Sequence, residues 1–147
     1  MRFYAIDAHG PDLECLKTAI ATAVTIARNL ACGITLLVPD LERANRTVLV
    51  DALGDRFLTR LREARPATLL GQPIKLHTAD SVNPFNEKGV LVVLWGNRTM
   101  LKRAAQCRRC KATICPALFP GELGNWVAKN DATVLMGSRT LPASQST

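Results

Sequence analysis

Six residues that follow apolar segments of the chain carry groups suited to an anionic ligand. They are Asp7, His9, Asp40, Trp95, Asn97 and Arg98. Arg98 offers a guanidinium that fits a phosphate, and the turn at 96–99 opens a helix whose first backbone N–H groups attract anions. Trp95 offers a ring on which a base can stack, and Asp7 offers acceptors for hydroxyls of a ribose or amines of a base. This set predicts a binding site for a nucleotide or another phosphate compound.

The turn at 96–99 is not a recognised phosphate-binding motif. It contains Gly-Asn-Arg-Thr, which matches neither GxxxxGK[ST] nor GxGxxG. A tight strand-to-helix turn capped by Thr99 is the alternative interpretation. The chain also lacks the GxSxG and HExxH signatures of common hydrolases. The sequence therefore favours a binding protein over an enzyme, and it leaves any cofactor unknown.

Asp7 and Asp40 suggest a second chemistry, because carboxylates at neighbouring strand ends can hold a divalent cation. With His9 as a proton-transfer group, they would form a metal-assisted phosphoester hydrolase. Aspartates that follow strands also cap helices and make turns, and no spacing here is diagnostic of a metal site. The hydrolase is therefore an alternative function, and no metal ligand is assigned.

The chain is basic, with 19 Lys and Arg against 12 Asp and Glu and a net charge of +7. No acidic residue occurs between Lys88 and Pro120. This balance favours an anionic partner. A nucleic acid is the weaker choice, because single-strand binders need aromatic side chains and none lies between Trp95 and Phe119. We therefore expect a solvated basic helix face, formed by Arg98, Lys102, Gln106 and Arg109.

Two of the five cysteines, Cys107 and Cys110, have CxxC spacing, and Cys115 follows them. In thioredoxin-type sites such a pair opens a helix, whereas here it is expected to close one. A zinc site would need a fourth ligand, and only His9 and His77 are available, both distant in sequence. Unpaired thiols are the simplest interpretation.

Strands and helices must position these groups, and the spacing of apolar residues along the chain indicates where they occur. Strands are expected at 2–6, 34–38, 73–78, 90–95, 112–115 and 132–136, and helices at 11–31, 41–64, 98–109 and 121–130. Gly33 should end the first helix, and Gly54 should weaken the second so that it forms two pieces. Segments 66–72 and 79–88 should be loops. The strand at 73–78 should lie near an edge, because polar and apolar side chains alternate along it.

These elements predict a three-layer α/β domain, with a mostly parallel sheet of five to six strands and helices on both faces (Rossmann- or flavodoxin-like). Residues 1–137 should form this single domain and 138–147 a loosely ordered tail. Ligands of such sheets bind outside the carboxyl ends of the strands, where the strand order reverses. The six candidate residues should therefore share one rim.

The first helix is apolar nearly all round, which suggests deep burial or cover by a second subunit. An oligomeric interaction protein without a small-molecule ligand is thus a third candidate function, and a homo-oligomer a candidate assembly. The chain has neither a signal-peptide core nor an apolar stretch long enough to cross a membrane. We therefore expect a cytoplasmic protein with no membrane partner.

Two segments resemble parts of the universal-stress proteins. Residues 2–38, RFYAIDAHGPDLECLKTAIATAVTIARNLACGITLLV, are similar to the family's first strand-helix-strand unit, in which an Asp ends the first strand, and ATVLMGSR is similar to a later strand. Together they cover less than a third of the chain. The glycine-spaced phosphate loop of that family should follow Gly137, where this chain ends in LPASQST, and an additional strand intervenes. The resemblance implies that Asp7 lies near a bound adenosine, and no activity is transferred.

Overall fold

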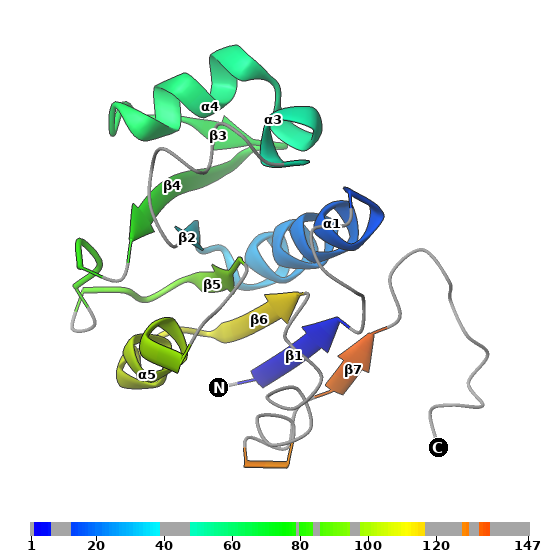
Figure 1. The fold of residues 1–147 in the computed structure, drawn as a ribbon, viewed down its shortest axis with the longest axis vertical. Helices are drawn as coiled ribbons and strands as arrows, with labels where there is room; N and C mark the ends of the chain where they lie inside the picture. Colours follow the sequence, from blue (N-terminus) through cyan, green and yellow to red (C-terminus); the bar gives the residue numbers. More distant parts are fainter. Residues whose placement is uncertain are drawn as a thin grey trace.

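The computed structural model describes residues 2–6, 13–38, 48–78, 80–83, 86–94, 98–116, 128–129 and 133–135. The strands are β1 (Arg2–Ile6), β2 (Ile34–Val38), β3 (Thr68–Leu69), β4 (Gln72–Thr78), β5 (Val90–Val93), β6 (Ala112–Pro116) and β7 (Thr133–Leu135). The helices are α1 (Leu13–Leu30), α3 (Val48–Leu53), α4 (Asp55–Arg62) and α5 (Arg98–Gln106). Figure 1 shows the strands side by side with the helices packed against them.

The seven strands of the described residues form one sheet, in the order β3-β4-β2-β5-β6-β1-β7. Every neighbouring pair is parallel except β3 with β4. The amino ends are aligned, because one row of Cα partners runs through Arg2, Ala112, Val90, Ile34 and Ile74. The predicted mostly parallel α/β sheet is confirmed.

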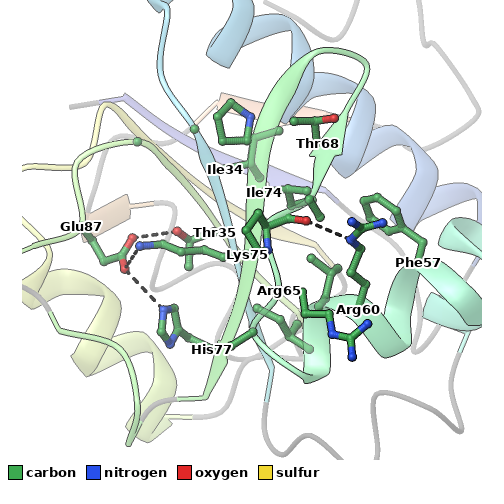
Figure 2. A pocket seen from close by; sticks show the side chains of 18 of the residues that line it. Ile34, Thr35, Phe57, Arg60, Arg65, Thr68, Ile74, Lys75, His77 and Glu87 are labelled. Carbon is green, nitrogen blue, oxygen red and sulfur yellow. Dashed lines mark hydrogen bonds and ion pairs between the residues drawn. The ribbon is translucent and has the colours of Figure 1, made fainter.

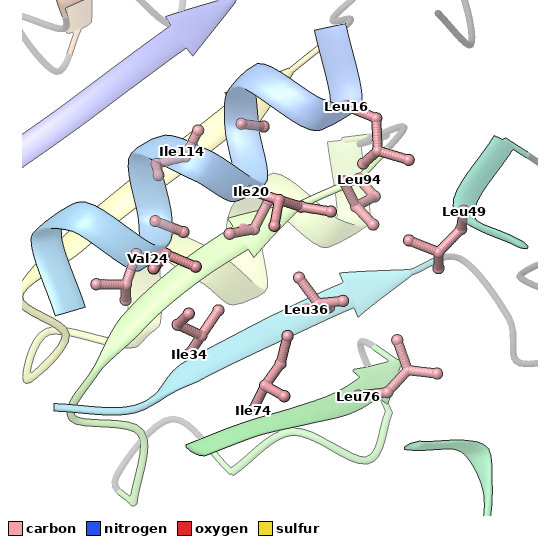
Figure 3. Packing of buried hydrophobic residues seen from close by; sticks show 14 of the residues in the cluster. Leu16, Ile20, Val24, Ile34, Leu36, Leu49, Ile74, Leu76, Leu94 and Ile114 are labelled. Carbon is pink, nitrogen blue, oxygen red and sulfur yellow. The ribbon is translucent and has the colours of Figure 1, made fainter. Parts of the chain in front are cut away.

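Two hydrophobic cores, one on each face of the sheet, establish the three layers. Successive side chains of a strand point to opposite faces, so β2 contributes Leu36 to one core and Leu37 to the other. The larger core contains residues of α1, α3 and α4, including Leu16, Leu49 and Leu58. Figure 3 shows side chains of α1 directed at those of β2. The smaller core contains α5, through Met100 and Ala104.

Strand β3 lies in segment 66–72, which was expected to be a loop. A two-residue turn joins β3 to β4, and both of its residues have positive φ, 49° at Leu70 and 90° at Gly71. Two successive positive φ values are typical of the tight hairpin turns that match the twist of antiparallel strands. Leucine is rare at such a position, and the usual Asn-Gly or Asp-Gly signal is missing. The hairpin was therefore not recognised in the sequence.

Helices α1 and α4 are each followed, within two residues, by an alanine in the left-handed conformation. Ala31 has φ 53° and Ala64 has φ 57°. Each end has the paired backbone hydrogen bonds of a Schellman motif, Ala31 N–Arg28 O with Cys32 N–Ala27 O, and Ala64 N–Leu61 O with Arg65 N–Arg60 O. The expectation that Gly33 ends the first helix is therefore wrong, because the chain leaves the helix two residues earlier.

Helix α1 is amphipathic and not apolar all round. Its outer face exposes Lys17, Ala21, Thr25 and Arg28, and Ile26 is partly buried against the larger core. The small side chains on this face explain the apolar composition, so the helix no longer argues for a second subunit. No helix in the described part of the chain is long and apolar enough to cross a bilayer.

Other boundaries agree with the sequence pattern in part, and α5 ends at Gln106, three residues before the expected end of the helix at 98–109. Gly54, with φ 89°, separates α3 from α4 as expected for the second helical segment. Strand β5 ends at Val93, two residues before the expected end at Trp95, which lies outside the described residues. On α5 the side chains of Met100 and Ala104 face the sheet, and Lys102, Ala105 and Gln106 are exposed.

Candidate functional site

The predicted site residues follow strands whose carboxyl ends lie along one edge of the sheet. Asp7, His9, Asp40, Trp95 and Asn97 lie outside the described residues, and Arg98 is the first residue of α5 with no side-chain description. The strands that precede them are β1, β2 and β5, which end at Ile6, Val38 and Val93. These strands all run in the same direction. Their carboxyl ends therefore lie at the same edge of the sheet, from which the chain continues toward the predicted site residues.

The strand order reverses between β2 and β5. These strands are neighbours, with Leu37 paired to Val93. The chain leaves β2 through α3 and α4 toward β4, on the side of the larger core. It leaves β5 through α5 toward β6, in the opposite direction and on the side of the smaller core. Divergent connections of this kind open a crevice at the carboxyl ends of the two strands.

Asp7 follows a strand farther along the same edge. Strand β6 lies between β1 and β5. Neighbouring strands are about 4.8 Å apart, so the end of β1 lies about 10 Å from the end of β5. The topology thus places the carboxyl ends of β2 and β5 next to each other, and the carboxyl end of β1 two strands away from β5.

A second group of polar residues lies on the smaller-core side of β2 and β4. Glu87, in the connection between β4 and β5, is buried, with 3% of its surface exposed. Oγ1 of Thr35 donates a 2.7 Å hydrogen bond to Oε2 of Glu87, and Nζ of Lys75 lies 3.0 Å from Oε1. Nε2 of His77 is 3.9 Å from the same Oε1. Figure 2 shows these side chains meeting on one side of β4. We call them the Glu87 cluster.

His77 connects the buried carboxylate to an exposed hydroxyl. Its Nδ1 is 3.0 Å from Oγ of Ser81, which also accepts a 2.9 Å hydrogen bond from the backbone N–H of Thr78. Burial lowers the pKa of His77, and the nearby Glu87 carboxylate opposes this effect only in part. The neutral imidazole is therefore the favoured form near pH 7.

Sequence reasoning missed the Glu87 cluster. Thr35, Lys75 and His77 alternate along two strands, so their common face was readable from the period of two. Glu87 lies in the segment 79–88, which was expected to be a loop and which forms no helix or strand in its described part. Nothing local marks this glutamate as buried, because its partners are up to 52 residues away in sequence.

Three cysteines belong to the smaller core, two in the connection between α5 and β6 and one on β6. Cys107, Cys110 and Cys115 are buried free thiols. A hydrogen bond between the side chains of Cys107 and Cys110 lowers the pKa of Cys107 and raises that of Cys110. The Cys110 thiol also contacts the backbone oxygen of Glu87 at 3.6 Å. Among the described residues, no three His, Cys, Asp or Glu side chains are grouped in a way that could hold a metal ion.

A cavity of about 960 Å³ lies beside β4. One side is lined by buried or half-buried apolar residues of the larger core, Ile34, Phe57, Leu61, Ile74 and Leu76. Arg60 and Arg65 also line it, and the cavity reaches the Glu87 cluster on the other side of β4 (Figure 2). Its size is within the range of small-molecule sites. None of the described residues that line it was predicted as a site residue from the sequence.

Comparisons with known proteins add no functional information. No family model matches the chain, so the resemblance to universal-stress proteins is not supported by a family match. No curated protein sequence and no solved structure matches it either.

Proposed function

We propose that the protein is a binding module for an anionic ligand, a nucleotide or another phosphate compound, at the carboxyl edge of the sheet. The observation that carries the proposal is the reversal of strand order between β2 and β5. Ligands of parallel sheets bind in the crevice that such a reversal opens. The proposed ligand-binding residues are those that follow β1, β2 and β5, namely Asp7, His9, Asp40, Trp95, Asn97 and Arg98.

Charge and helix geometry support an anion at this position. Helix α5 is the next helix after β5 and begins at Arg98, so the positive end of its dipole belongs to the same edge. The segment from Lys88 to Pro120 contains no acidic residue to repel a phosphate. In the proposed complex Arg98 holds the phosphate, Trp95 stacks on the base and Asp7 accepts hydrogen bonds from the ribose or base. The separation of β1 from β5, about 10 Å, is one that a nucleoside phosphate can bridge.

Thermal unfolding with ATP, GTP and pyrophosphate, each with and without Mg²⁺, tests the proposal. A ligand at 100 times its Kd that binds only the native protein adds about 2.7 kcal/mol of stability. The substitution Arg98→Gln should remove the stabilisation. The control Lys102→Gln, an exposed position one turn later on α5, should keep it. If none of these compounds raises the thermal unfolding temperature, the proposal is wrong.

The rival functions are outcomes of two further measurements. Mg²⁺- or Mn²⁺-dependent turnover of bis(p-nitrophenyl) phosphate that is lost in Asp7→Asn and in Asp40→Asn would assign a hydrolase instead. The mass in solution reports an oligomer, and an oligomer without any nucleotide response would favour an interaction protein.

A further inference from the structure

The cavity beside β4 is open because β3 covers only the start of its neighbour. Strand β3 pairs with Gln72 and Pro73, and the backbone N–H of Ile74 reaches the oxygen of Ala67. From there the chain before β3 turns away at Pro66, which has no N–H to donate to a further ladder bond. The rest of β4 therefore borders the cavity.

The end of α4 brings two guanidinium groups to the mouth of this cavity. The Schellman motif bonds the backbone N–H of Arg65 to the oxygen of Arg60, so the two residues lie next to each other although five positions separate them. Nε of Arg60 donates a 2.9 Å hydrogen bond to the backbone oxygen of Pro66. This bond holds the Arg60 side chain in place and leaves its two terminal nitrogens for a ligand. Figure 2 shows both arginines on the Phe57 side of β4.

The charges on the two sides of β4 differ. On the Glu87 side, Lys75 is paired with the buried carboxylate of Glu87. On the Phe57 side, no carboxylate of the described residues lies within ion-pair distance of Arg60. Arg65 is 3.2 Å from Glu63, but both side chains are largely exposed, and such a surface pair is weak enough to yield to a ligand. The apolar half of the cavity is therefore bordered by positive charge.

We propose that this half of the cavity is a second site, separate from the carboxyl edge, for a small amphipathic organic anion. The apolar body of the ligand lies against Phe57, Leu61 and Ile74. Its carboxylate, sulfonate or phosphate group lies between Arg60 and Arg65, whose planar guanidinium groups pair well with such anions. A pocket that is mostly apolar with a few convergent polar groups is the usual form of a small-molecule site.

Two fluorescent probes that share their rings and differ in charge test the site. One is 1-anilinonaphthalene-8-sulfonate, and the other is the neutral N-phenyl-1-naphthylamine. We expect saturable binding of the sulfonate with one site per chain, together with a rise in the thermal unfolding temperature, because a ligand of the native state stabilises it. No saturable binding, or a fall in unfolding temperature that indicates binding to a loosened state, overturns the proposal.

Charge variants separate the anion contact from general electrostatics. The double substitution Arg60→Gln with Arg65→Gln should weaken sulfonate binding about tenfold or more, which is a loss of about 1.4 kcal/mol. The same variant should leave binding of the neutral probe unchanged. Arg56→Gln, an exposed residue of α4 that does not line the cavity, is the matched control and should change neither probe. Equal weakening of both probes in the double variant, or of the sulfonate in the control, overturns the proposal.

A steric variant locates the apolar body. Thr68 is exposed and lines the cavity, so Thr68→Trp fills space there without entering the core, and tryptophan is well tolerated in strands. Binding of both probes should fall together, and unchanged binding counts against the site. The site is independent of the carboxyl edge. ATP should not displace the sulfonate, and Arg98→Gln should not weaken it, so failure of either proposal leaves the other open to its own test.

Discussion

Oγ1 of Thr35 donates a 2.7 Å hydrogen bond to Oε2 of Glu87, and the two residues are 52 positions apart in the chain. The contact fixes the connection between β4 and β5 onto the smaller-core side of β2. It also gives a buried carboxylate one of the partners it needs, with Lys75 as the other.

Removal of this hydroxyl should destabilise the protein. In Thr35→Val the shape and strand preference are kept, but the buried Glu87 loses a donor, which costs about 1–3 kcal/mol. Urea unfolding measures the change in the free energy of unfolding. In a Glu87→Leu background the same substitution should have little effect, because no carboxylate then needs the hydroxyl. Equal losses in both backgrounds would show that the hydrogen bond contributes nothing.

The stability of the protein should depend on the protonation of His77. Burial lowers its pKa in the folded state below the ordinary value of 6.5 that the unfolded chain retains. The unfolded state then binds more protons as the pH falls through 6.5, so the free energy of unfolding should decrease between pH 7.5 and pH 5.5. The variant His77→Gln should show a smaller decrease over this range. A steeper decrease in the variant would reverse the sign of the proposed linkage.

Glycine should be better than alanine at the ends of α1 and α4. Ala31 and Ala64 adopt left-handed φ values that disfavour a side chain. Ala31→Gly and Ala64→Gly should each stabilise the protein by about 0.5–1 kcal/mol, after allowance for the greater freedom of glycine in the unfolded chain. Chemical denaturation of each variant checks this. Ala21→Gly, in the exposed middle of α1, is the control and should destabilise by about 1 kcal/mol.

Gly89 should not tolerate any side chain. A Cβ at this position would collide with the backbone oxygen of Gly33, at the point where β2 and β5 begin. Gly89→Ala should destabilise by about 1–3 kcal/mol, as overpacking typically does. At Gly33 a Cβ would lie 3.2 Å from the oxygen of Pro73, so Gly33→Ala should cost less. Thermal unfolding of the two variants gives the order, and the reverse order would contradict this account of the close strand contact.

Arg62 carries a buried nitrogen that the described residues do not satisfy. Its Nε has no hydrogen-bond partner among them. A buried donor without an acceptor costs about 1–3 kcal/mol, so Arg62→Met should keep the packing of the aliphatic part and raise the free energy of unfolding. Arg56→Met, at an exposed position of the same helix, should change it by less than about 0.5 kcal/mol. Destabilisation by Arg62→Met would mean that the arginine contributes more than its orphaned nitrogen costs.

Local pattern predicted much of the fold. The strands Arg2–Ile6 and Ile34–Val38 have the expected bounds, and β4 differs by one residue. The break at Gly54 was also expected. Errors arose where backbone conformation contradicted residue preference. Leu70 occupies a turn position that favours glycine or asparagine, and Ala31 ends α1 where Gly33 was expected to do so.

The two candidate sites differ in how much of each could be predicted from the sequence. The residues of the proposed carboxyl-edge site were found because they follow apolar strands, which is a local property. Their grouping depends on the order β2-β5-β6-β1, and β1 lies two strands away from β5. The cavity beside β4 was not predicted, because Phe57 and Arg60 belong to α4 and Ile74 to β4, and only the packed fold sets the spacing of these two elements.

The amino-acid sequence by itself determined most of the strands and helices of the described residues, because the periods of apolar residues are local, and it determined the excess of positive charge. The tertiary structure alone decided which strands are neighbours, where the connections diverge, and that Glu87 is buried beside Thr35. The physical reason is that these relationships join residues far apart in the chain. Their free energy comes from burial and pairing in the packed sheet, which no short segment can express.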